Sequence, residues 1–427
     1  MNNNVEVYQV CTNSNCGHTF DLSVMLFKCP DCGASLEYQM TGTYSGPSGD
    51  RSDLWAHFDM LPLSDPHHII SLGAGNSEII HMEELSRELN GAELYLMCDS
   101  GKNPTGTFKD REASVIMSRC REIGLDNLVF YSTANTGRSY THFAAHLGLT
   151  TYLFMPSQCA YKNTSFIRRN ENNFIIYVDE NYSRIAPYTK EFVAVNGLTA
   201  IAPMHDRIES YATVAYEQFN KLPDCKYFVQ TIASGMGVIG FYKGHRNLLR
   251  MGVQSAEAIP KVICVQSEEM NIMSTAYNSG WPTLTDDHLP KVFRENLFEP
   301  TLNSTNPVNN YPQLKSTLDE NNGIITDVSP KQALSEEPLI IRVLKERNIS
   351  LRADLEKSLM IGYAGVVKLA RQGRFKKGEK ILLLSCGRGR DTTTDLLSPD
   401  AVIDTRKRDP ADLYKQLSTP KEIYTSL

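Results

Sequence analysis

From about residue 70 onward, short apolar runs alternate with longer segments that carry apolar residues at helical spacing. The apolar runs have the length of buried strands and lie at 128–131, 151–155, 174–178, 261–265 and 381–384. The helical segments include 110–123, 138–147, 208–221 and 355–372. Apolar runs without polar alternation are typical of parallel strands covered on both faces. The alternation therefore predicts an α/β fold with right-handed crossovers.

Four cysteines near the N-terminus form two close pairs, Cys11 with Cys16 and Cys29 with Cys32. Two such pairs, each on its own turn, can close a tetrahedral shell of thiolates around zinc. Glycines directly after Cys16 and Cys32 fit such turns, where a positive φ often follows the ligand. The sequence thus predicts a four-cysteine zinc ribbon over residues 1–45. Because no ligand position stays open, the zinc would be structural. The alternative is a chance cluster among ten cysteines.

Neither His18 nor the other six cysteines are expected to bind the metal. His18 lies close to the pairs but is expected to be a surface residue rather than a ligand. The remaining six cysteines are scattered singly and are expected to be small buried apolar side chains. In a reducing compartment none of the ten is expected to form a disulfide framework.

Length and charge narrow the possible functions. With 427 residues the chain can form two or three domains. Lys and Arg (43) nearly balance Asp and Glu (49), so charge gives no reason to expect nucleic acid or an anionic membrane as partner. The polar N-terminus is not a signal peptide, and no apolar run is long enough to span a membrane, which predicts a cytoplasmic protein. Residues 297–330, rich in Asn, Pro, Ser and Thr, predict a long ordered loop.

The segment 103–111 (NPTGTFKDR) carries the first candidate for chemistry. A Gly/Pro turn leads into a predicted helix whose first turn holds Lys109 between an aromatic residue and an aspartate. A lysine beside a cofactor pocket is suited to form a Schiff base, because desolvation lowers its pKa. Taken alone, a solvated lysine at a helix start would be the simpler interpretation.

Three loops, each directly after a strand-like run, favour the cofactor interpretation. The loop 132–137 (STANTG) leaves amide groups free for a carboxylate, and Asn135 can hydrogen-bond a ring oxygen, although an ordinary helix cap has the same composition. The loop 233–238 (ASGMGV) has the glycines of a phosphate cradle before a helix. In 383–389 (LLSCGRG), a hydroxyl or thiol can meet a pyridine nitrogen and, having no fixed charge, would leave that nitrogen largely unprotonated.

Together these segments resemble the threonine synthase and cysteate synthase group of fold-type-II pyridoxal-phosphate (PLP) enzymes. The similar pairs are SLGAGNSEI (71–79) with SLGEGNTPL, PTGTFKDRE (104–112) with PTGSFKDRG, STANTGRS (132–139) with STGNTAAS, and RIESYATVAYE (207–217) with RIEGQKTxAYE. The match runs from about residue 60 to 395. It implies two interleaved three-layer α/β/α domains, the smaller at about 110–225, followed by a C-terminal extension at 396–427. An N-terminal zinc ribbon is common in this group, and dimers are usual.

The resemblance also implies roles for individual residues. Lys109 would form the Schiff base with PLP and then carry protons. Asn135 would contact the 3′-oxygen of PLP, and either Ser385 or Cys386 would meet its ring nitrogen. The phosphate of PLP would be held by Ser234, Gly235, Met236, Gly237 and Val238. The substrate carboxylate would be taken by the loop that contains Ser132, Thr133 and Thr136.

Departures from the group's pattern bear on the substrate. Ala74 replaces a glutamate, Glu78 replaces a proline, and Cys386 stands where serine or threonine is usual. Gly137-Arg138 replaces a small pair and gives NTGR, the form of cysteate synthases, which use O-phosphoserine and sulfite. Arg138 could clamp a phosphate or sulfonate, or could be a solvated arginine on a first helical turn. Against cysteate synthase, the lysine stands in TFKDRE, as in threonine synthases.

The sequence therefore predicts a PLP enzyme that acts on an O-phosphorylated amino acid. In the leading hypothesis, O-phosphohomoserine loses phosphate and water adds to give threonine. In the alternative, O-phosphoserine loses phosphate and a nucleophile such as sulfite replaces it. Both hypotheses need the same electron sink and the same base, so the motifs do not separate them. A remote third hypothesis is a binding module that keeps the PLP fold without catalysis.

Overall fold

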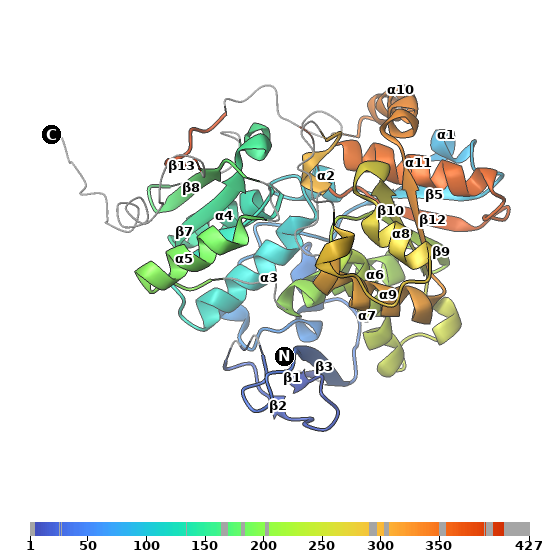
Figure 1. The fold of residues 1–427 in the computed structure, drawn as a ribbon. Helices are drawn as coiled ribbons and strands as arrows, with labels where there is room; N and C mark the ends of the chain where they lie inside the picture. Colours follow the sequence, from blue (N-terminus) through green and yellow to red (C-terminus); the bar gives the residue numbers. More distant parts are fainter. Residues whose placement is uncertain are drawn as a thin grey trace.

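Three β-sheets organise the chain in the computed structural model (Figure 1). The structure describes residues 5–24, 26, 28–133, 135–163, 170–180, 184–200, 205–289, 297–302, 307–349, 356–387, 389 and 396–404. The predicted C-terminal extension lies outside the described residues from 405 on, as does the predicted catalytic boundary near 395.

The largest sheet has six strands in the order β11-β10-β9-β12-β5-β4. Its strands are β4 (Ile79–His81), β5 (Glu93–Met97), β9 (Cys225–Thr231), β10 (Lys261–Ser267), β11 (Ile324–Val328) and β12 (Lys380–Leu384). Every neighbouring pair is parallel except β4, which runs antiparallel to β5.

Helices cover both faces of this sheet. One face packs against α1 (Glu83–Ser86), α10 (Pro330–Glu346) and α11 (Lys357–Arg371). The other face packs against α6 (His205–Lys221), α7 (Met236–Arg250), α8 (Ile272–Asn278) and α9 (Pro307–Asn321). Along β10, Ile263 and Val265 face the first layer, whereas Val262 and Cys264 face the second. Because successive side chains enter opposite cores, the strand must be apolar throughout.

A smaller sheet has four parallel strands in the order β13-β8-β7-β6. Its strands are β6 (Asn127–Tyr131), β7 (Thr150–Pro156), β8 (Asn173–Val178) and β13 (Ala401–Ile403). Helices α3 (Lys109–Glu122) and α4 (Asn135–Leu147) pack on one face, and α5 (Ala186–Asn196) packs on the other. Since β13 lies within the predicted C-terminal extension, that segment contributes a strand to this sheet.

The N-terminal sheet has the antiparallel order β2-β1-β3, formed by β1 (Val5–Cys11), β2 (Thr19–Phe20) and β3 (Leu36–Gly42). It lies against α6 and α7 in Figure 1. The Tyr38 hydroxyl donates to Asp206 on α6 at 2.9 Å, and Lys243 on α7 donates to the Tyr38 carbonyl at 2.6 Å. These buried contacts fix the ribbon to the helices of the large sheet.

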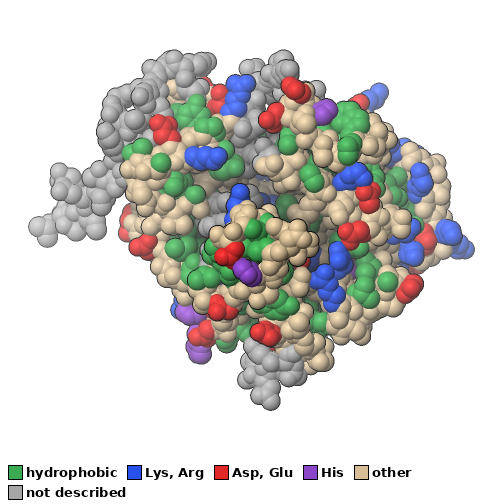
Figure 2. Space-filling model, turned by 60° about the horizontal axis from the view of Figure 1, so that its bottom comes forward, with side chains coloured by type: hydrophobic (Ala, Val, Ile, Leu, Met, Phe, Trp, Pro, Cys, Tyr) green, Lys and Arg blue, Asp and Glu red, His purple; other side chains and the backbone are tan. Residues whose placement is uncertain are grey.

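Short helical turns complete the described chain. They are α2 (Asp99–Lys102), η1 (Leu54–Met60), η2 (Pro66–His68), η3 (Ser157–Lys162), η5 (Ala256–Ala258), η6 (Glu268–Met270), η7 (Asp286–His288) and η8 (Pro300–Leu302). None of the helices that the structure describes is long and apolar enough to cross a bilayer. Figure 2 turns the bottom of Figure 1 toward the viewer and shows acidic and basic side chains intermixed on that face.

The predicted α/β fold is confirmed, and the five predicted strands correspond to β6, β7, β8, β10 and β12. The six single cysteines are buried and unpaired, as expected. The prediction of a long loop over 297–330 is wrong, because α9 and β11 occupy most of its described residues. Its Asn, Pro and Ser content concealed an apolar stripe of Tyr311, Leu314 and Leu318, which is fully buried against the large sheet.

Helices α6 and α7 pack closely because two glycines of α7 face α6. A Cβ atom at Gly240 would lie 2.7 Å from the Ile208 carbonyl oxygen and 2.5 Å from the Cβ of Tyr211. A Cβ atom at Gly244 would lie 2.6 Å from the Ala212 carbonyl oxygen. The spacing of four residues puts both glycines on one helix face.

We expect Gly240→Ala to lower the free energy of unfolding by about 1–3 kcal/mol, the usual cost of overpacking. Helix propensity alone would favour alanine by about 1 kcal/mol, so a net loss would show that the close packing dominates. Urea unfolding followed by circular dichroism measures the change. Leu249→Ala, at an exposed position of the same helix, is the control and should change stability by less than about 0.5 kcal/mol. Equal effects of the two substitutions would contradict the packing argument.

Candidate active site

A pocket opens where the carboxyl ends of strands from both larger sheets meet. This is the usual position of ligand sites in open α/β sheets. The described lining residues are Phe108, Lys109, Thr133, Asn135, Thr136, Gln230, Thr231, Ile232, Ala233, Ser234, Gly235, Met236, Gly237, Thr301, Leu302, Glu356, Ser358 and Cys386. Lys109 is the one cationic side chain among them.

Lys109 is the first residue of α3, and its amine is held in the pocket wall. The Nζ atom donates to the Tyr211 hydroxyl at 2.6 Å and lies 3.6 Å from a carboxylate oxygen of Glu112. The ring of Phe108 lies 4.4 Å from Nζ. Burial lowers the pKa of Lys109 to about 8, and the Glu112 carboxylate opposes that fall. At neutral pH the amine is therefore mostly an ammonium with a minor neutral fraction, which is far larger than for an ordinary lysine and suits a group that both takes up and releases protons.

The glycine loop between β9 and α7 has the geometry of an anion cradle. Gly235 caps α7 with a φ of +80°, a left-handed conformation that favours glycine. The first amides of this 15-residue helix have no carbonyl partner within the helix, and the residues that carry them, Gly235, Met236 and Gly237, line the pocket. A Cβ atom at Gly237 would lie 2.5 Å from the Gln230 amide nitrogen, so no side chain fits there without displacing Gln230.

Two buried polar atoms in the pocket wall fit a polar ligand. The side-chain carbonyl oxygens of Asn135 and Gln230 have no hydrogen-bond partner among the described residues. An unpaired buried oxygen is costly unless a ligand or water satisfies it. With the glycine cradle and a lysine of lowered pKa, these atoms make the wall suited to a phosphorylated aldehyde cofactor such as PLP.

The turn after β12 lies against the start of α3. The Cys386 carbonyl accepts hydrogen bonds from the Thr107 hydroxyl at 2.9 Å and from the Phe108 amide at 3.0 Å. The Cys386 side chain lines the pocket, and burial raises the pKa of its thiol, so it stays neutral. Ser385 instead pairs with the Ser100 hydroxyl and does not line the pocket. Of the two candidates for the ring nitrogen, only Cys386 lines the pocket.

The loop at 132–138 is only partly directed into the pocket. Thr133, Asn135 and Thr136 line it, whereas the Ser132 hydroxyl accepts from the Gly137 amide at 2.9 Å. Arg138 is 3% exposed and donates from Nη2 to the Thr105 carbonyl at 3.0 Å. The interpretation of Arg138 as a solvated arginine is therefore wrong. It is also not among the lining residues, in contrast to what a substrate clamp requires.

Among the predicted phosphate-loop residues, Ser234, Gly235, Met236 and Gly237 line the pocket together. Val238 lies one position further into α7, and its side chain is fully buried in the core between α7 and the large sheet. Its side chain thus has a packing role.

Glu356 is a pocket residue that sequence reasoning missed. One carboxylate oxygen accepts from the Lys162 amine at 2.7 Å and from the Asn135 amide at 3.0 Å. The other accepts from the Ser358 hydroxyl. A Cβ atom at Gly387 would lie 2.6 Å from this carboxylate. Glu356 precedes α11 as its N-cap residue, and a single acidic residue before a helix gives no signal that separates a pocket wall from an ordinary cap.

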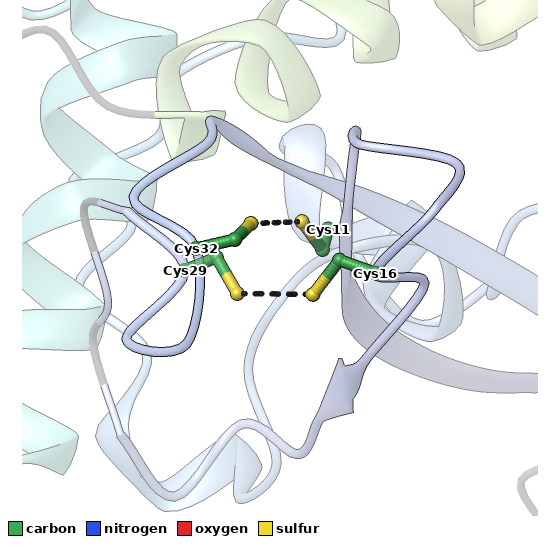
Figure 3. Close-up of side chains that lie close together, drawn as sticks. All are labelled: Cys11, Cys16, Cys29 and Cys32. Carbon is green, nitrogen blue, oxygen red and sulfur yellow. Dashed lines mark hydrogen bonds between the residues drawn. The ribbon is translucent and has the colours of Figure 1, made fainter.

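The four N-terminal cysteines come together as a second candidate site. Figure 3 shows their sulfur atoms pointing toward one another from two loops. All four lie within 4.8 Å of one another, with Cys11 and Cys32 at 3.4 Å and Cys16 and Cys29 at 3.7 Å. A tetrahedral zinc with Zn–S bonds of about 2.3 Å needs sulfur separations of about 3.8 Å, so the donor set fits.

The loops around the cysteines have the expected backbone. Gly17 and Gly33, each directly after a cysteine, have φ values of 61° and 72°. His18 is exposed, and its ring lies 2.5 Å from Asp31. With Cys16, these two side chains form a second, more exposed group that could hold a metal.

Comparison with known proteins agrees with this geometry. Residues 70–387 match the family described as "Pyridoxal-phosphate dependent enzyme". The chain is similar to threonine synthase of Methanocaldococcus jannaschii, with 24% identity over 96% of this chain and 98% of the relative. It is also similar to threonine synthase of Methanosarcina acetivorans, with 21% identity over 91% and 94%.

Solved structures share the fold at lower identity. Maize serine racemase superposes with a TM-score of 0.59 at 14% identity, covering 74% of this chain and 91% of that one. A threonine deaminase of Solanum lycopersicum superposes with a TM-score of 0.57 at 17% identity, covering 80% and 82%. The pocket, its lysine and the family match over three-quarters of the sequence agree, and the chain belongs to the pyridoxal-phosphate dependent enzymes.

Proposed function

We propose that this chain is a lyase that eliminates phosphate from an O-phosphorylated amino acid, with O-phosphohomoserine as substrate and threonine as product. The observation that carries the proposal is Lys109, whose amine has a pKa of about 8 inside a pocket that also contains a glycine cradle. Similarity to threonine synthases along nearly the whole chain supports the choice of substrate. The remote hypothesis of a non-catalytic module gives no reason for this set of residues.

The residues of the pocket would hold PLP at several points. Lys109 would bond its aldehyde carbon, and the amides of Gly235, Met236 and Gly237 would bind its phosphate. Asn135 would meet the 3′-oxygen. The neutral thiol of Cys386 would face the ring nitrogen without donating a full charge. Bound PLP supplies an electron sink for the carbanion at the substrate α-carbon.

Lys109 would then transfer the protons of the reaction. In its neutral form the Lys109 amine would remove the α-proton of the substrate, and in its ammonium form it would return a proton to a neighbouring carbon. Thr133 and Thr136 lie beside it in the wall and would orient the substrate carboxylate. Loss of phosphate at Cγ and addition of water at Cβ require several such transfers within one closed pocket.

The alternative is replacement of the phosphate of O-phosphoserine by sulfite or another nucleophile. It rested on the NTGR sequence, and the burial of Arg138 outside the pocket lining weakens that support. The two hypotheses differ in the substrate that releases phosphate, so one assay separates them.

The test is phosphate release by the PLP-loaded protein with O-phosphohomoserine or O-phosphoserine, each with and without sulfite. We expect release from O-phosphohomoserine with threonine as product and no dependence on sulfite. Release from O-phosphoserine alone, with a product that depends on the nucleophile, would overturn the proposal in favour of the alternative. Release from neither would exclude both.

We further propose that the four N-terminal cysteines bind a structural zinc ion, that the protein is a homodimer, and that it is cytoplasmic. The sulfur geometry supports the first proposal, and the six single cysteines, each buried and without a disulfide, fit a reducing compartment. Light scattering tests the second, and fractionation of the producing cells tests the third.

We expect Cys29→Ser to reduce zinc from one ion per chain to nearly none. A site with three thiolates loses affinity, and the ribbon loses binding energy that can reach about 10–16 kcal/mol in isolated zinc peptides. Elemental analysis measures the zinc, and limited proteolysis before β3 reports the loosening. His18→Ala is the matched control and should keep the zinc, because His18 is a ligand only in the alternative group with Cys16 and Asp31. The opposite pattern would assign the metal to that group.

A further inference from the structure

The amine of Lys109 contacts two side chains that the PLP site itself does not require. Its Nζ atom donates to the Tyr211 hydroxyl at 2.6 Å, and that hydroxyl donates to a carboxylate oxygen of Glu112. The same carboxylate oxygen lies 3.6 Å from Nζ. Lysine, phenol and carboxylate therefore form a closed triangle of contacts that joins α3 to α6.

The charge of Glu112 is also held in place by side chains from α6 and α4. Its second oxygen accepts from Arg207 on α6 at 2.5 Å and from the Tyr140 hydroxyl on α4 at 2.6 Å. Burial alone would raise the pKa of Glu112, but the Arg207 guanidinium and the Lys109 amine lower it. The carboxylate is thus a fixed negative charge with no exposed surface.

Both contacts of Nζ stand at positions where the chain departs from the motifs it resembles. Glu112 stands where PTGSFKDRG has its last glycine, and Tyr211 stands where RIEGQKTxAYE has glutamine. The two positions are 99 residues apart, yet their side chains hydrogen-bond each other beside the same amine. Because both substituted side chains contact Lys109 Nζ, we take them to have a joint role at that atom.

We propose that Glu112 and Tyr211 form an anionic dock for the Lys109 amine. The dock receives Nζ whenever it is not bonded to the cofactor and keeps it available as an ammonium. Tyr211, which touches the reacting nitrogen, is a catalytic residue, and Glu112 is a positioning residue. The inference rests on the proposed function only in taking Lys109 as the lysine that bonds PLP.

The dock would hold one proton on Nζ between its removal from one substrate carbon and its delivery to the next. When the neutral amine removes a proton from a substrate carbon, the C–H electron pair stays with the substrate and Nζ becomes an ammonium. That ammonium donates to the Tyr211 oxygen while Tyr211 donates to Glu112. The proton then leaves from Nζ to the next carbon, and both dock residues return unchanged. Without the dock, desolvation would favour the neutral amine, which can accept a proton but has none to return.

The test is the pH dependence of PLP capture by the cofactor-free full chain, followed by the rise of visible absorbance and by borohydride trapping. Only the neutral amine attacks the aldehyde, so the rate rises with pH around the pKa of Lys109, which is about 8. The charged or titratable groups near this amine are Glu112, Tyr211, Arg207 and Cys386. No amino-acid substrate is present, so the result does not depend on which one the enzyme uses.

We expect Glu112→Gln to lower the midpoint by about one to three pH units, the usual effect of an opposite charge at this distance. Tyr211→Phe should lower it by less, and Glu112→Asp, which keeps the charge, should restore most of the wild-type value. Tyr140→Phe is the matched control, since it removes a phenol from the same carboxylate without touching Nζ, and Arg207 still pairs with that carboxylate and keeps it charged. Its midpoint should stay close to that of wild type.

An unchanged midpoint in both Glu112→Gln and Tyr211→Phe would overturn the dock. So would an equal shift in Tyr140→Phe, because the effect would then be a general loosening of the three helices. If Glu112→Gln does not fold, the comparison of Tyr211→Phe with Tyr140→Phe decides the question. If the midpoints shift as expected but no phosphorylated amino acid is consumed, the proposed function fails and the dock stands.

Discussion

Lys109→Ala is expected to abolish the reducible yellow chromophore of the purified protein and to eliminate measurable phosphate release. The described pocket offers no second lysine that could replace it, since the Lys162 amine is fully buried between Glu299 and Glu356. Loss of the proton transfers alone would lower kcat by about 10²- to 10⁴-fold, and loss of the covalent anchor adds to that. The effect should therefore be the largest of any single substitution in the pocket.

Absorbance spectra before and after borohydride treatment, with a phosphate assay on the same samples, measure both parts of this prediction. Lys102→Ala is the matched control, because Lys102 lies seven residues away on an exposed turn and donates only to the Ser52 carbonyl. It should keep its colour and its activity. A chromophore that survives in Lys109→Ala would mean that another amine bonds the cofactor.

The sequence predicted the pocket residues that stand in loops directly after strands. Lys109, Asn135, Gly235 and Cys386 all lie at the carboxyl end of a strand or the start of the next helix, where parallel topology brings distant segments together. An apolar run followed by small residues is a local signal, so it can be recognised without a structure.

The residues that the sequence did not reveal act through distant partners. Glu356 meets Asn135 and Lys162 across about 200 residues, and Tyr211 meets Lys109 across about 100. Neither has a neighbour in sequence that marks it as special. The substrate clamp predicted for Arg138 illustrates the opposite case. Its motif was easy to recognise, but the guanidinium donates to the Thr105 carbonyl and does not line the pocket. Local patterns do not specify the direction of a side chain on a first helical turn.

Substitution of Arg111, two residues after Lys109, is expected to cause the second large effect, a loss of stability. Its guanidinium is fully buried and donates to both oxygens of Asp99 at 2.8 Å and to both oxygens of Glu217 at 2.5 and 2.8 Å. The same carboxylates accept hydrogen bonds from the loop at Asn76 and Ser77. One arginine therefore pairs with two buried carboxylates and joins α2, α3, α6 and this loop.

We expect Arg111→Met to lower the free energy of unfolding by at least about 3–5 kcal/mol, because it leaves two carboxylates buried without their cation. That is a large share of the roughly 5–15 kcal/mol by which a domain is stable. Urea unfolding measures the loss. The matched control is Arg246→Met, which removes an ion pair with Glu320 in which both side chains are about 40% exposed. Exposed pairs contribute about 0–1 kcal/mol, so the control should be nearly neutral.

Arg111→Met can lose stability because two carboxylates are left without their cation or because packing is lost. The pH dependence of the loss in free energy of unfolding distinguishes these two causes. In the wild type, burial raises the pKa of Glu217, but Arg111 outweighs it and the pKa lies below its usual value. The ionised carboxylate then contributes stability above the unfolded-state pKa, and this is lost as pH falls through the folded-state value. In Arg111→Met the strongest opposing charge is removed, so burial raises the folded-state pKa of Glu217 above its wild-type value, and protonation of this carboxylate then stabilises the variant relative to the wild type as pH falls. The difference in the free energy of unfolding between wild type and variant should therefore be smaller at pH 5 than at pH 7. A difference that does not change with pH would mean that Arg111 stabilises the fold through packing alone.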